Sequence, residues 1–207
     1  MAILDNVAYL NGATIVLLFY EPIKTAFYYI KELIDIIVLM GHSASGKSTI
    51  EKKLTEKGYK KIVSYTTRPP RKGEVDGIDY HFVTELDFKG LKMGNKLAEH
   101  AIYRGWHYGI LKEDCKNNTV AVVEPNGLNQ LNAIEHLDIT SFYIKTSENL
   151  RVSRMALRGD DFSEIIRRTY SDQGTFNGAE YIADHTINND GDLDKTLEEI
   201  LRIIEDV

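Results

Sequence analysis

Residues 41–48 read Gly-His-Ser-Ala-Ser-Gly-Lys-Ser and have the composition of a loop that binds phosphate. They match the pattern G-x-x-x-x-G-K-[ST], in which the glycines let several backbone N–H groups point at one phosphate. Lys47 adds a positive charge for the β and γ phosphates, and the Ser48 hydroxyl is an oxygen ligand suited to Mg²⁺. The pattern predicts a nucleoside triphosphate site formed by Gly41, Ser43, Ala44, Ser45, Gly46, Lys47, Ser48 and Thr49.

A second group of residues could hold another phosphate. Arg68 and Arg71 lie three residues apart, on a segment that Pro69 and Pro70 stiffen. Guanidinium groups bind phosphate oxygens in pairs, and the Tyr80 hydroxyl can donate a further hydrogen bond to the same anion. A solvated basic turn would explain an isolated pair of arginines, but it does not explain the whole run that surrounds them.

Further along the chain, several arginines are spaced as on one face of a helix. Arg151, Arg154 and Arg158 follow each other at intervals of three and four residues, and Arg167 and Arg168 come soon after. Residues at these intervals share one helix face. On spacing alone, a solvated face is the commoner explanation of such a pattern.

The elements around these residues alternate between strand and helix. Residues 35–40 form a continuous apolar run, as expected of a strand buried on both faces, and residues 48–57 predict a helix that Gly58 ends. The alternation predicts a parallel sheet in an α/β fold. The other predicted strands are 61–65, 119–123, 140–144 and 185–187, the other predicted helices are 148–157 and 193–204, and the mixed stretch 79–108 suggests an inserted lobe.

Residues 1–34 have a different character and contain no pattern that suggests chemistry. Segments 7–10 and 13–20 flank Asn11-Gly12, which predicts a hairpin. Pro22 could then open a helix, because Ile23, Phe27, Ile30 and Ile34 recur at helical spacing. We treat residues 1–34 as an N-terminal extension of unknown role.

Composition excludes some classes of partner. The net charge is −6, which disfavours a nucleic-acid polymer. The longest apolar run is much shorter than the ~20 residues that cross a bilayer, so we expect no membrane partner. A single cysteine, Cys115, and the lack of a signal-peptide pattern are typical of a cytoplasmic protein.

The run from Ser64 to Phe82, S-Y-T-T-R-P-P-R-K-G-E-V-D-G-I-D-Y-H-F, together with the phosphate loop, resembles the guanylate kinase family. The resemblance spans residue 35 to the C-terminus, with features of a shortened, phage-like or prophage-like variant. It implies a P-loop NTPase fold, in which a three-layer core with a parallel sheet (35–63 and 117–207) carries a small mixed lobe for the nucleoside monophosphate (about 64–116) and a helical lid (about 151–172). It also implies an ATP-dependent kinase that phosphorylates GMP or dGMP with Mg²⁺, as a monomer or homodimer.

The resemblance also assigns roles to residues. Glu99 would accept hydrogen bonds from the N1–H and 2-amino groups of guanine, which adenine cannot supply. Asn188 would contact the adenine of ATP, and Ser48, with Glu124 through a water, would support Mg²⁺. Lys47, Arg154, Arg158 and Arg168 would be catalytic, with Arg167 as an alternative to Arg168. The GMP site would comprise Ser64, Arg68, Arg71, Glu74, Tyr80, Glu99, Tyr108 and Glu124.

Two departures leave alternatives open. Ile110 stands where the family usually has Ser or Thr to read guanine, and Val122 replaces an acid that supports the metal. A kinase for another or a modified nucleotide, or for a phosphorylated ribose, is therefore one alternative. A non-catalytic binding module is another, although such modules typically have a degraded phosphate loop, whereas Lys47 and Ser48 are intact here.

Overall fold

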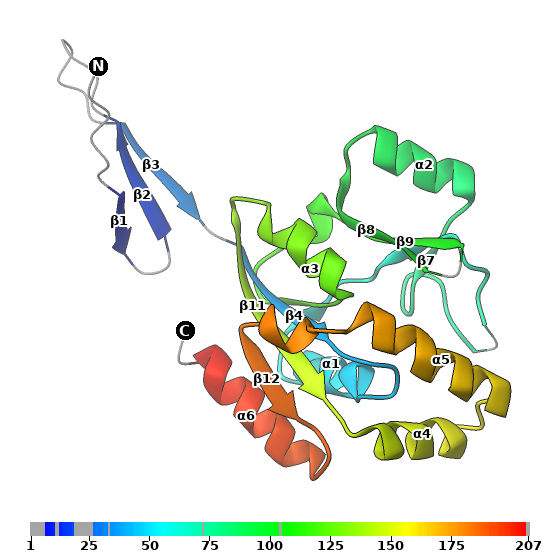
Figure 1. The fold of residues 1–207 in the computed structure, drawn as a ribbon. Coiled ribbons are helices and arrows are strands. Elements are labelled where there is room, and N and C mark those ends of the chain that lie inside the picture. The colour runs from blue at the N-terminus through cyan, green and yellow to red at the C-terminus, as the bar shows by residue number, and fades with distance from the viewer. Residues whose placement is uncertain are drawn as a thin grey trace.

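The computed structural model describes residues 7–10, 13–18, 27–32, 34–71, 73–103 and 105–205, and it describes side chains from residue 35 onward. Within this part of the chain the strands form three separate sheets of three, five and four strands. Helices pack around the five-stranded sheet, as Figure 1 shows. The predicted P-loop NTPase fold of the α/β class is confirmed.

The central sheet is entirely parallel and has the strand order β12-β11-β4-β10-β5. The strand that precedes the phosphate loop lies in the middle, which buries it on both faces and explains its unbroken apolar run. The strands are β4 (Ile34–Met40), β5 (Lys60–Lys61), β10 (Thr119–Val122), β11 (Leu137–Lys145) and β12 (His185–Asn188).

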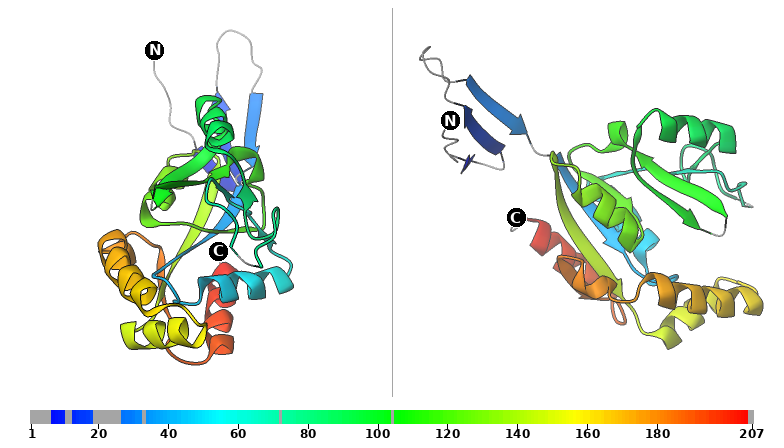
Figure 2. Two further views of the ribbon diagram at one scale, coloured as in Figure 1. Left: turned by 90° about the vertical axis from the view of Figure 1, so that its right-hand side faces the viewer. Right: turned by 45° about the horizontal axis from the view of Figure 1, so that its top comes forward.

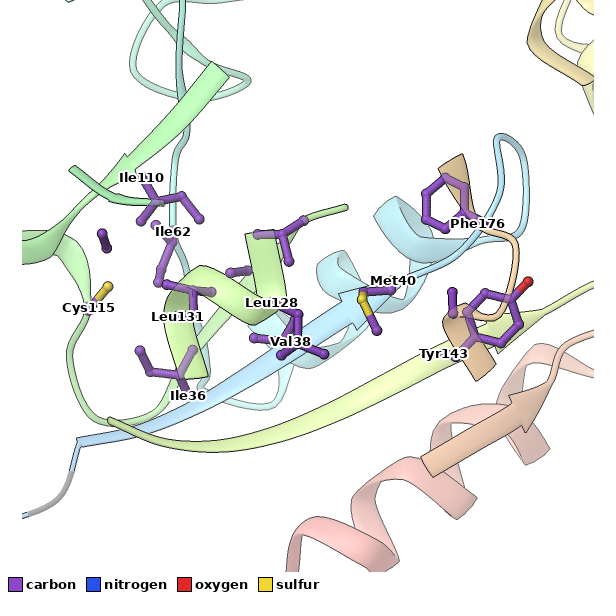
Figure 3. Packing of buried hydrophobic residues seen from close by; sticks show 14 residues of the cluster. Ile36, Val38, Met40, Ile62, Ile110, Cys115, Leu128, Leu131, Tyr143 and Phe176 are labelled. Carbon is purple, nitrogen blue, oxygen red and sulfur yellow. The ribbon is translucent and has the colours of Figure 1, made fainter. Parts of the chain in front are cut away.

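Helices cover both faces of this sheet. Alternate residues of β4 point to opposite faces, so Ile37 and Leu39 contribute to one buried cluster while Val38 and Met40 contribute to another. The first cluster is covered by α1 (Lys47–Glu56) and α6 (Leu193–Glu205). The second is covered by α3 (Pro125–Asn132) and by the segment around Phe176, as Figure 3 shows.

A mixed four-stranded sheet, with the order β7-β6-β9-β8, forms the inserted lobe. Its helix α2 (Glu85–Met93) begins with a capping box between Thr84 and Asp87. One predicted strand, 61–65, is wrong as a single element, because the chain leaves the central sheet after Lys61 and joins the lobe at Tyr65. The lobe strands are β6 (Tyr65–Thr66), β7 (His81–Phe82), β8 (Leu97–Tyr103) and β9 (Trp106–Leu111), and a 3-10 turn, η1 (Lys112–Asp114), follows.

Two helices, α4 (Glu148–Leu157) and α5 (Phe162–Thr175), follow β11. The prediction for α4 agrees with the structure at both ends. Figures 1 and 2 show that this helix pair and the inserted lobe extend from the same end of the central sheet, where the phosphate loop also lies. A second 3-10 turn, η2 (Ala179–Tyr181), leads from α5 back toward β12.

The N-terminal strands form a sheet of their own, with β1 (Val7–Leu10), β2 (Ala13–Leu18) and β3 (Phe27–Glu32) antiparallel. The predicted hairpin of β1 and β2 is confirmed, whereas the predicted helix is wrong over residues 27–32, which pair with β2. Aromatic and β-branched residues such as those of β3 favour strands when a partner is available. Residues 11–12 and 19–26, including Pro22, lie outside the described residues. None of the described helices is long and apolar enough to cross a membrane.

Candidate active site

The phosphate loop joins β4 to α1 and depends on glycine at two positions. Gly41 and Gly46 have φ angles of 149° and 107°, which side chains other than glycine rarely adopt. A Cβ atom at Gly41 would lie 2.6 Å from the carbonyl oxygen of Ile144, and one at Gly46 would lie 2.3 Å from Nδ2 of Asn189. Both glycines therefore allow neighbouring backbone and side chains to approach the loop closely.

Three donors hold the loop in place through the carbonyl oxygen of Ser45. The Thr146 hydroxyl donates at 3.0 Å, the Asn189 amide at 2.7 Å and the Arg154 guanidinium at 3.3 Å. Arg154 also donates to the carbonyl oxygen of Asn189 at 2.9 Å. In this structure the Arg154 guanidinium thus contacts backbone carbonyl oxygens of the phosphate loop and of Asn189. A contact with the transferring phosphoryl group would require the Arg154 side chain to change its conformation.

Lys47 lies at the first turn of α1 with its ammonium group folded toward the loop. Its Nζ donates to the carbonyl oxygens of Gly41 and His42, the latter at 2.8 Å, and lies 6.0 Å from the ring centre of Phe176. Burial lowers the pKa of Lys47 to about 8, although the nearby Asp172 carboxylate opposes this effect. The side chain is therefore largely charged at neutral pH.

One side of the loop borders a hollow of about 420 Å³. Arg158 and Asn189 face it from outside the loop. Asn188, which we expected near adenine, does not line it; its side chain is exposed and accepts a hydrogen bond from the backbone N–H of Asp190 at 2.8 Å. The neighbouring Asn189 does line it. The hollow is lined by Ala44, Gly46, Lys47, Ser48, Thr49, Arg154, Arg158, Asn189 and Leu193.

The other side of the loop borders a cavity of about 260 Å³ between the core, the inserted lobe and α5. It brings together most residues that were expected to bind the acceptor, although they are spread over positions 64 to 124 of the chain. Those residues are Ser64, Arg68, Arg71, Tyr80, Glu99, Tyr108 and Glu124. Lys47 borders this cavity as well as the hollow on the opposite side.

An ion pair with Glu74 fixes the position of Arg68 in the cavity wall. The two side chains form a bidentate ion pair with distances of 3.0 and 2.9 Å, and Glu74 also accepts the backbone N–H of Arg71 at 2.7 Å. Burial raises the pKa of the Glu74 carboxyl, but the hydrogen bonds from Arg68 and Arg71 outweigh burial and lower it overall. Glu74 does not itself line the cavity, and in this structure its carboxylate orients the two arginines.

Glu99 presents an unusual buried carboxylate. Only 6% of the residue is exposed, and none of the described residues donates a hydrogen bond to its carboxylate. Burial, together with the nearby charge of Glu124, raises the pKa of Glu99 to about 7. Glu124 lies directly before α3, and burial raises the pKa of its carboxyl as well. An acceptor that borders the cavity and has no donor among the described residues is suited to a ligand that brings two N–H donors.

Arg158, just after α4, and the two arginines of α5 are each paired with an acid of the same region. Arg158 forms an ion pair with Asp160, and Glu164 accepts from Arg167 at 2.8 Å and from Arg168 at 2.7 Å. Arg168 lines the acceptor cavity, whereas Arg167 does not. The geometry therefore favours Arg168 over the alternative Arg167.

Some cavity residues were missed by sequence reasoning. Asp172 lies one turn after Arg168 on α5, only 4% exposed, and Tyr103 and Phe176 also line the cavity. The spacing of four residues from Arg168 could have indicated Asp172. Of the two departures from the family pattern, Val122 lines the cavity, whereas Ile110 is fully buried in the core.

Comparisons with known proteins agree with this arrangement. A family model described as guanylate kinase matches residues 34–207. The guanylate kinase of Mycoplasmoides gallisepticum is 33% identical over 178 residues, which cover 82% of this chain and 91% of the relative, and that of Rickettsia typhi is 34% identical over 179 residues, which cover 82% and 89%. The crystal structure of guanylate kinase from Anaplasma phagocytophilum matches with a TM-score of 0.62 at 27% identity, covering 84% of this chain and 86% of that one.

Proposed function

Because this chain belongs to the guanylate kinase family, we propose that its two hollows hold ATP and GMP on opposite sides of Lys47. The chain is an ATP-dependent guanylate kinase, which transfers the γ-phosphoryl group of ATP to GMP. Beyond this activity, we propose roles for the residues that line the two hollows.

The observation that carries the proposal is the position of Lys47 between the two hollows. A phosphoryl group that moves in line from donor to acceptor must pass the boundary between the two sites. Lys47 is the loop residue that carries a positive charge to this boundary, where it can neutralise charge on the transferring group. No enzyme nucleophile is required, so Cys115, which is buried and lies outside both hollows, needs no role.

The acceptor phosphate is held by the arginines of the inserted lobe. Arg68 and Arg71 supply the guanidinium groups, and Tyr80 and Tyr108 supply hydroxyl donors from the same wall. Arg68 also lies 5.4 Å from the ring centre of Tyr80, which keeps both side chains in the cavity. The prior ion pair with Glu74 means that Arg68 loses little conformational freedom when the phosphate arrives.

Guanine is read by Glu99, which accepts from N1–H and from the 2-amino group. Adenine lacks both donors and would leave this buried carboxylate unpaired, which can reject a substrate by ~10⁴-fold or more. Ser64 lines the same cavity and adds a hydroxyl near the base. Both GMP and dGMP present the guanine edge that this site requires.

The donor phosphates are held by the loop amides, and three arginines surround the transferring group. Arg154 and Arg158 approach from the donor side and Arg168 from the acceptor side. Because Asp160 and Glu164 pair with Arg158 and Arg168 here, the arginines must exchange these carboxylates for phosphate when both substrates are bound. Closure of α4 and α5 would also exclude water, which could otherwise accept the phosphoryl group.

Magnesium is the cofactor that we propose, and the residues present fit it. The exposed Ser48 hydroxyl at the start of α1 and the Glu124 carboxylate directly before α3 are both hard oxygen ligands. Mg²⁺ that arrives with a nucleotide needs only one or two protein oxygens. When bound, the ion supplies positive charge to the phosphates. Ser48 would bind it directly, and Glu124 through a water.

The last part of the proposal concerns the location and the partners of the enzyme. The net charge of −6 disfavours a nucleic-acid polymer as a partner, and the substrates are cytoplasmic metabolites. We propose that the enzyme works in the cytoplasm, without a membrane partner, as a monomer or homodimer.

Label transfer tests the proposed function directly. With ATP labelled at its γ phosphorus and unlabelled GMP, we expect the label to appear in the β phosphate of GDP, and the Arg71→Ala variant should transfer it far more slowly. Label released only as inorganic phosphate would contradict the proposal, because it would mean that water rather than GMP is the acceptor.

A further inference from the structure

Asp172 is a buried acid of the active site to which the phosphoryl transfer described above gives no task. The residue is only 4% exposed and lies on α5, in the wall of the acceptor cavity. Its Oδ2 atom accepts a short hydrogen bond from the backbone N–H of Ser43, a residue of the phosphate loop. Its charge also raises the pKa of Lys47, so the carboxylate acts on both the loop backbone and its ammonium group.

The Asp172 carboxylate lies at a backbone N–H of the phosphate loop, where a phosphate oxygen could bind. Backbone N–H groups of such a loop bind phosphate oxygens, and a carboxylate can occupy the same kind of site. Ser43 borders the acceptor cavity, whereas Gly46, Ser48 and Thr49 border the hollow for ATP. An anion at the Ser43 amide, next to Lys47, therefore lies where the terminal phosphate of ATP would face its acceptor.

Asp172 belongs to a row of α5 residues that docks on the loop. Arg168 lies one turn before it, and Phe176 lies just after the end of α5, all at intervals of four residues. The ring of Phe176 packs on His42 with 5.1 Å between ring centres, and Figure 3 shows it beside the loop that leaves β4. The contact of Asp172 thus fixes the helix that carries Arg168.

We propose that Asp172 occupies the place of the γ phosphate in the ligand-free enzyme and holds α5 docked until ATP displaces it. Asp172 is a positioning residue, since it acts through the placement of Arg168. The inference rests on the proposed function, because it takes the loop to be the ATP site.

The physical consequence is that ATP binding works against a negative charge. The γ phosphate and the Asp172 carboxylate repel each other and compete for the same amide and the same ammonium group. ATP therefore has to release α5, which couples arrival of the donor to a movement of Arg168 with its helix. Glu164, which accepts from Arg168 at 2.7 Å, lies on the same helix and moves with it. ADP lacks the γ phosphate and should leave the contact largely intact.

Calorimetry with Mg-ATP and Mg-ADP in the absence of GMP tests this proposal on the full chain. In Asp172→Asn the side chain can still accept the Ser43 hydrogen bond but carries no charge, and we expect ATP to bind about tenfold more tightly than to the wild type. ADP affinity should change by less than about threefold, because the removed charge faces the missing phosphate. A gain in affinity is not what a merely damaged fold would produce.

Two further variants complete the design. Asp172→Ala removes both the charge and the hydrogen bond and should also tighten ATP binding, and if it does not fold, Asp172→Asn decides alone. Glu198→Gln removes an exposed charge on α6 and should leave both affinities unchanged. Unchanged or weaker ATP binding by Asp172→Asn, or an equal gain for ATP and ADP, would overturn the inference. Failure of the wild type to bind ATP would instead contradict the proposed function itself.

Discussion

Glu99 and Lys47 show how burial prepares single residues for a charged ligand. Burial raises the pKa of the Glu99 carboxyl to about 7 and lowers that of the Lys47 ammonium to about 8. Burial thus makes the charged form of each group less stable than it would be in water. A ligand group of opposite polarity stabilises that charged form when it binds. The binding of guanine to Glu99 and of phosphate to Lys47 supplies those partners.

Acidity should therefore control the affinity for GMP. Only ionised Glu99 can accept both donors of guanine, so the KM for GMP should rise by about tenfold as the pH falls from 8 to 6. Glu99→Gln should raise the KM by about 100-fold, because its amide cannot accept both hydrogen bonds. Steady-state kinetics over this pH range measure both effects.

The Glu99→Gln variant is also the control for this pH dependence. The phosphate of GMP titrates in the same range, but it does so equally for both enzymes, so the ratio of the two KM values isolates Glu99. A ratio that is constant with pH would contradict the role of Glu99.

The raised pKa of Glu99 should also affect stability. Between its ordinary pKa of 4.5 and about 7, folded Glu99 holds a proton that the unfolded chain has lost. The free energy of unfolding of the wild type should therefore fall as the pH rises through this window, and the Glu99→Gln variant should lack this component.

Removal of the Lys47 ammonium should abolish most of the turnover. We expect Lys47→Ala to lower kcat by about 10³-fold, since the charge that neutralises the transferring phosphoryl is lost. Lys52→Ala removes an exposed lysine from the same helix and should retain wild-type kcat. A coupled assay of ADP release measures both variants, and near-normal turnover by a folded Lys47→Ala would contradict the proposed role.

At the scale of the element, the two glycines that flank α1 differ in what their surroundings allow. Gly46 and Gly58 have nearly the same φ angle, 107° and 105°. A Cβ at Gly46 would lie 2.3 Å from the Asn189 amide, whereas a Cβ at Gly58 would meet nothing within 4 Å. The pair therefore separates backbone strain from the close packing of the phosphate loop.

Substitution of these glycines should give two distinct outcomes. Gly58→Ala should lower the free energy of unfolding by about 1 kcal/mol through strain alone and leave the kinetics unchanged. Gly46→Ala should suffer a similar strain and in addition lose ATP binding, because Asn189 has to move away from the Ser45 carbonyl oxygen. Thermal unfolding and calorimetry distinguish the two, and unimpaired ATP binding by Gly46→Ala would refute this view of the loop.

Local patterns predicted elements well where the structure is decided locally. The apolar run of β4 and the helix α4 were predicted within one or two residues of their observed ends. The strand predicted over 61–65 failed because the chain changes sheets there. The helix predicted to open at Pro22 failed over residues 27–32 because pairing with β2 overrides helical spacing. Both errors arise from partners that are distant in sequence.

Site residues followed the same rule. The phosphate loop and the run from Ser64 to Phe82 were recognisable because each is contiguous in sequence, and most of the site residues predicted from them line the two hollows. Asp172 was missed because its contact with Ser43 joins positions 129 residues apart. Asn189 was not predicted, because only its hydrogen bond to the Ser45 carbonyl oxygen, which lies 144 positions earlier, distinguishes it from its neighbour Asn188.

At the scale of the whole molecule, the described N-terminal strands and the catalytic body are separate in their hydrogen bonding. β1, β2 and β3 pair only with one another, and the family match begins at residue 34. We therefore expect a chain that starts at Ile34 to keep kcat/KM for GMP within about twofold of the full chain, since both hollows are formed by later residues. A loss of more than tenfold in a folded, truncated enzyme would show that the extension contributes to the site.

The choice of acceptor tests the guanylate kinase activity most directly. Release of ADP from ATP should be measured with GMP, dGMP, AMP, CMP and UMP as acceptors under identical conditions. We predict turnover with GMP and dGMP, and kcat/KM values at least ~10³-fold lower for the other three, because none of them presents the adjacent N1–H and 2-amino donors that Glu99 accepts. Comparable turnover with AMP, or no turnover with any acceptor, would contradict this activity.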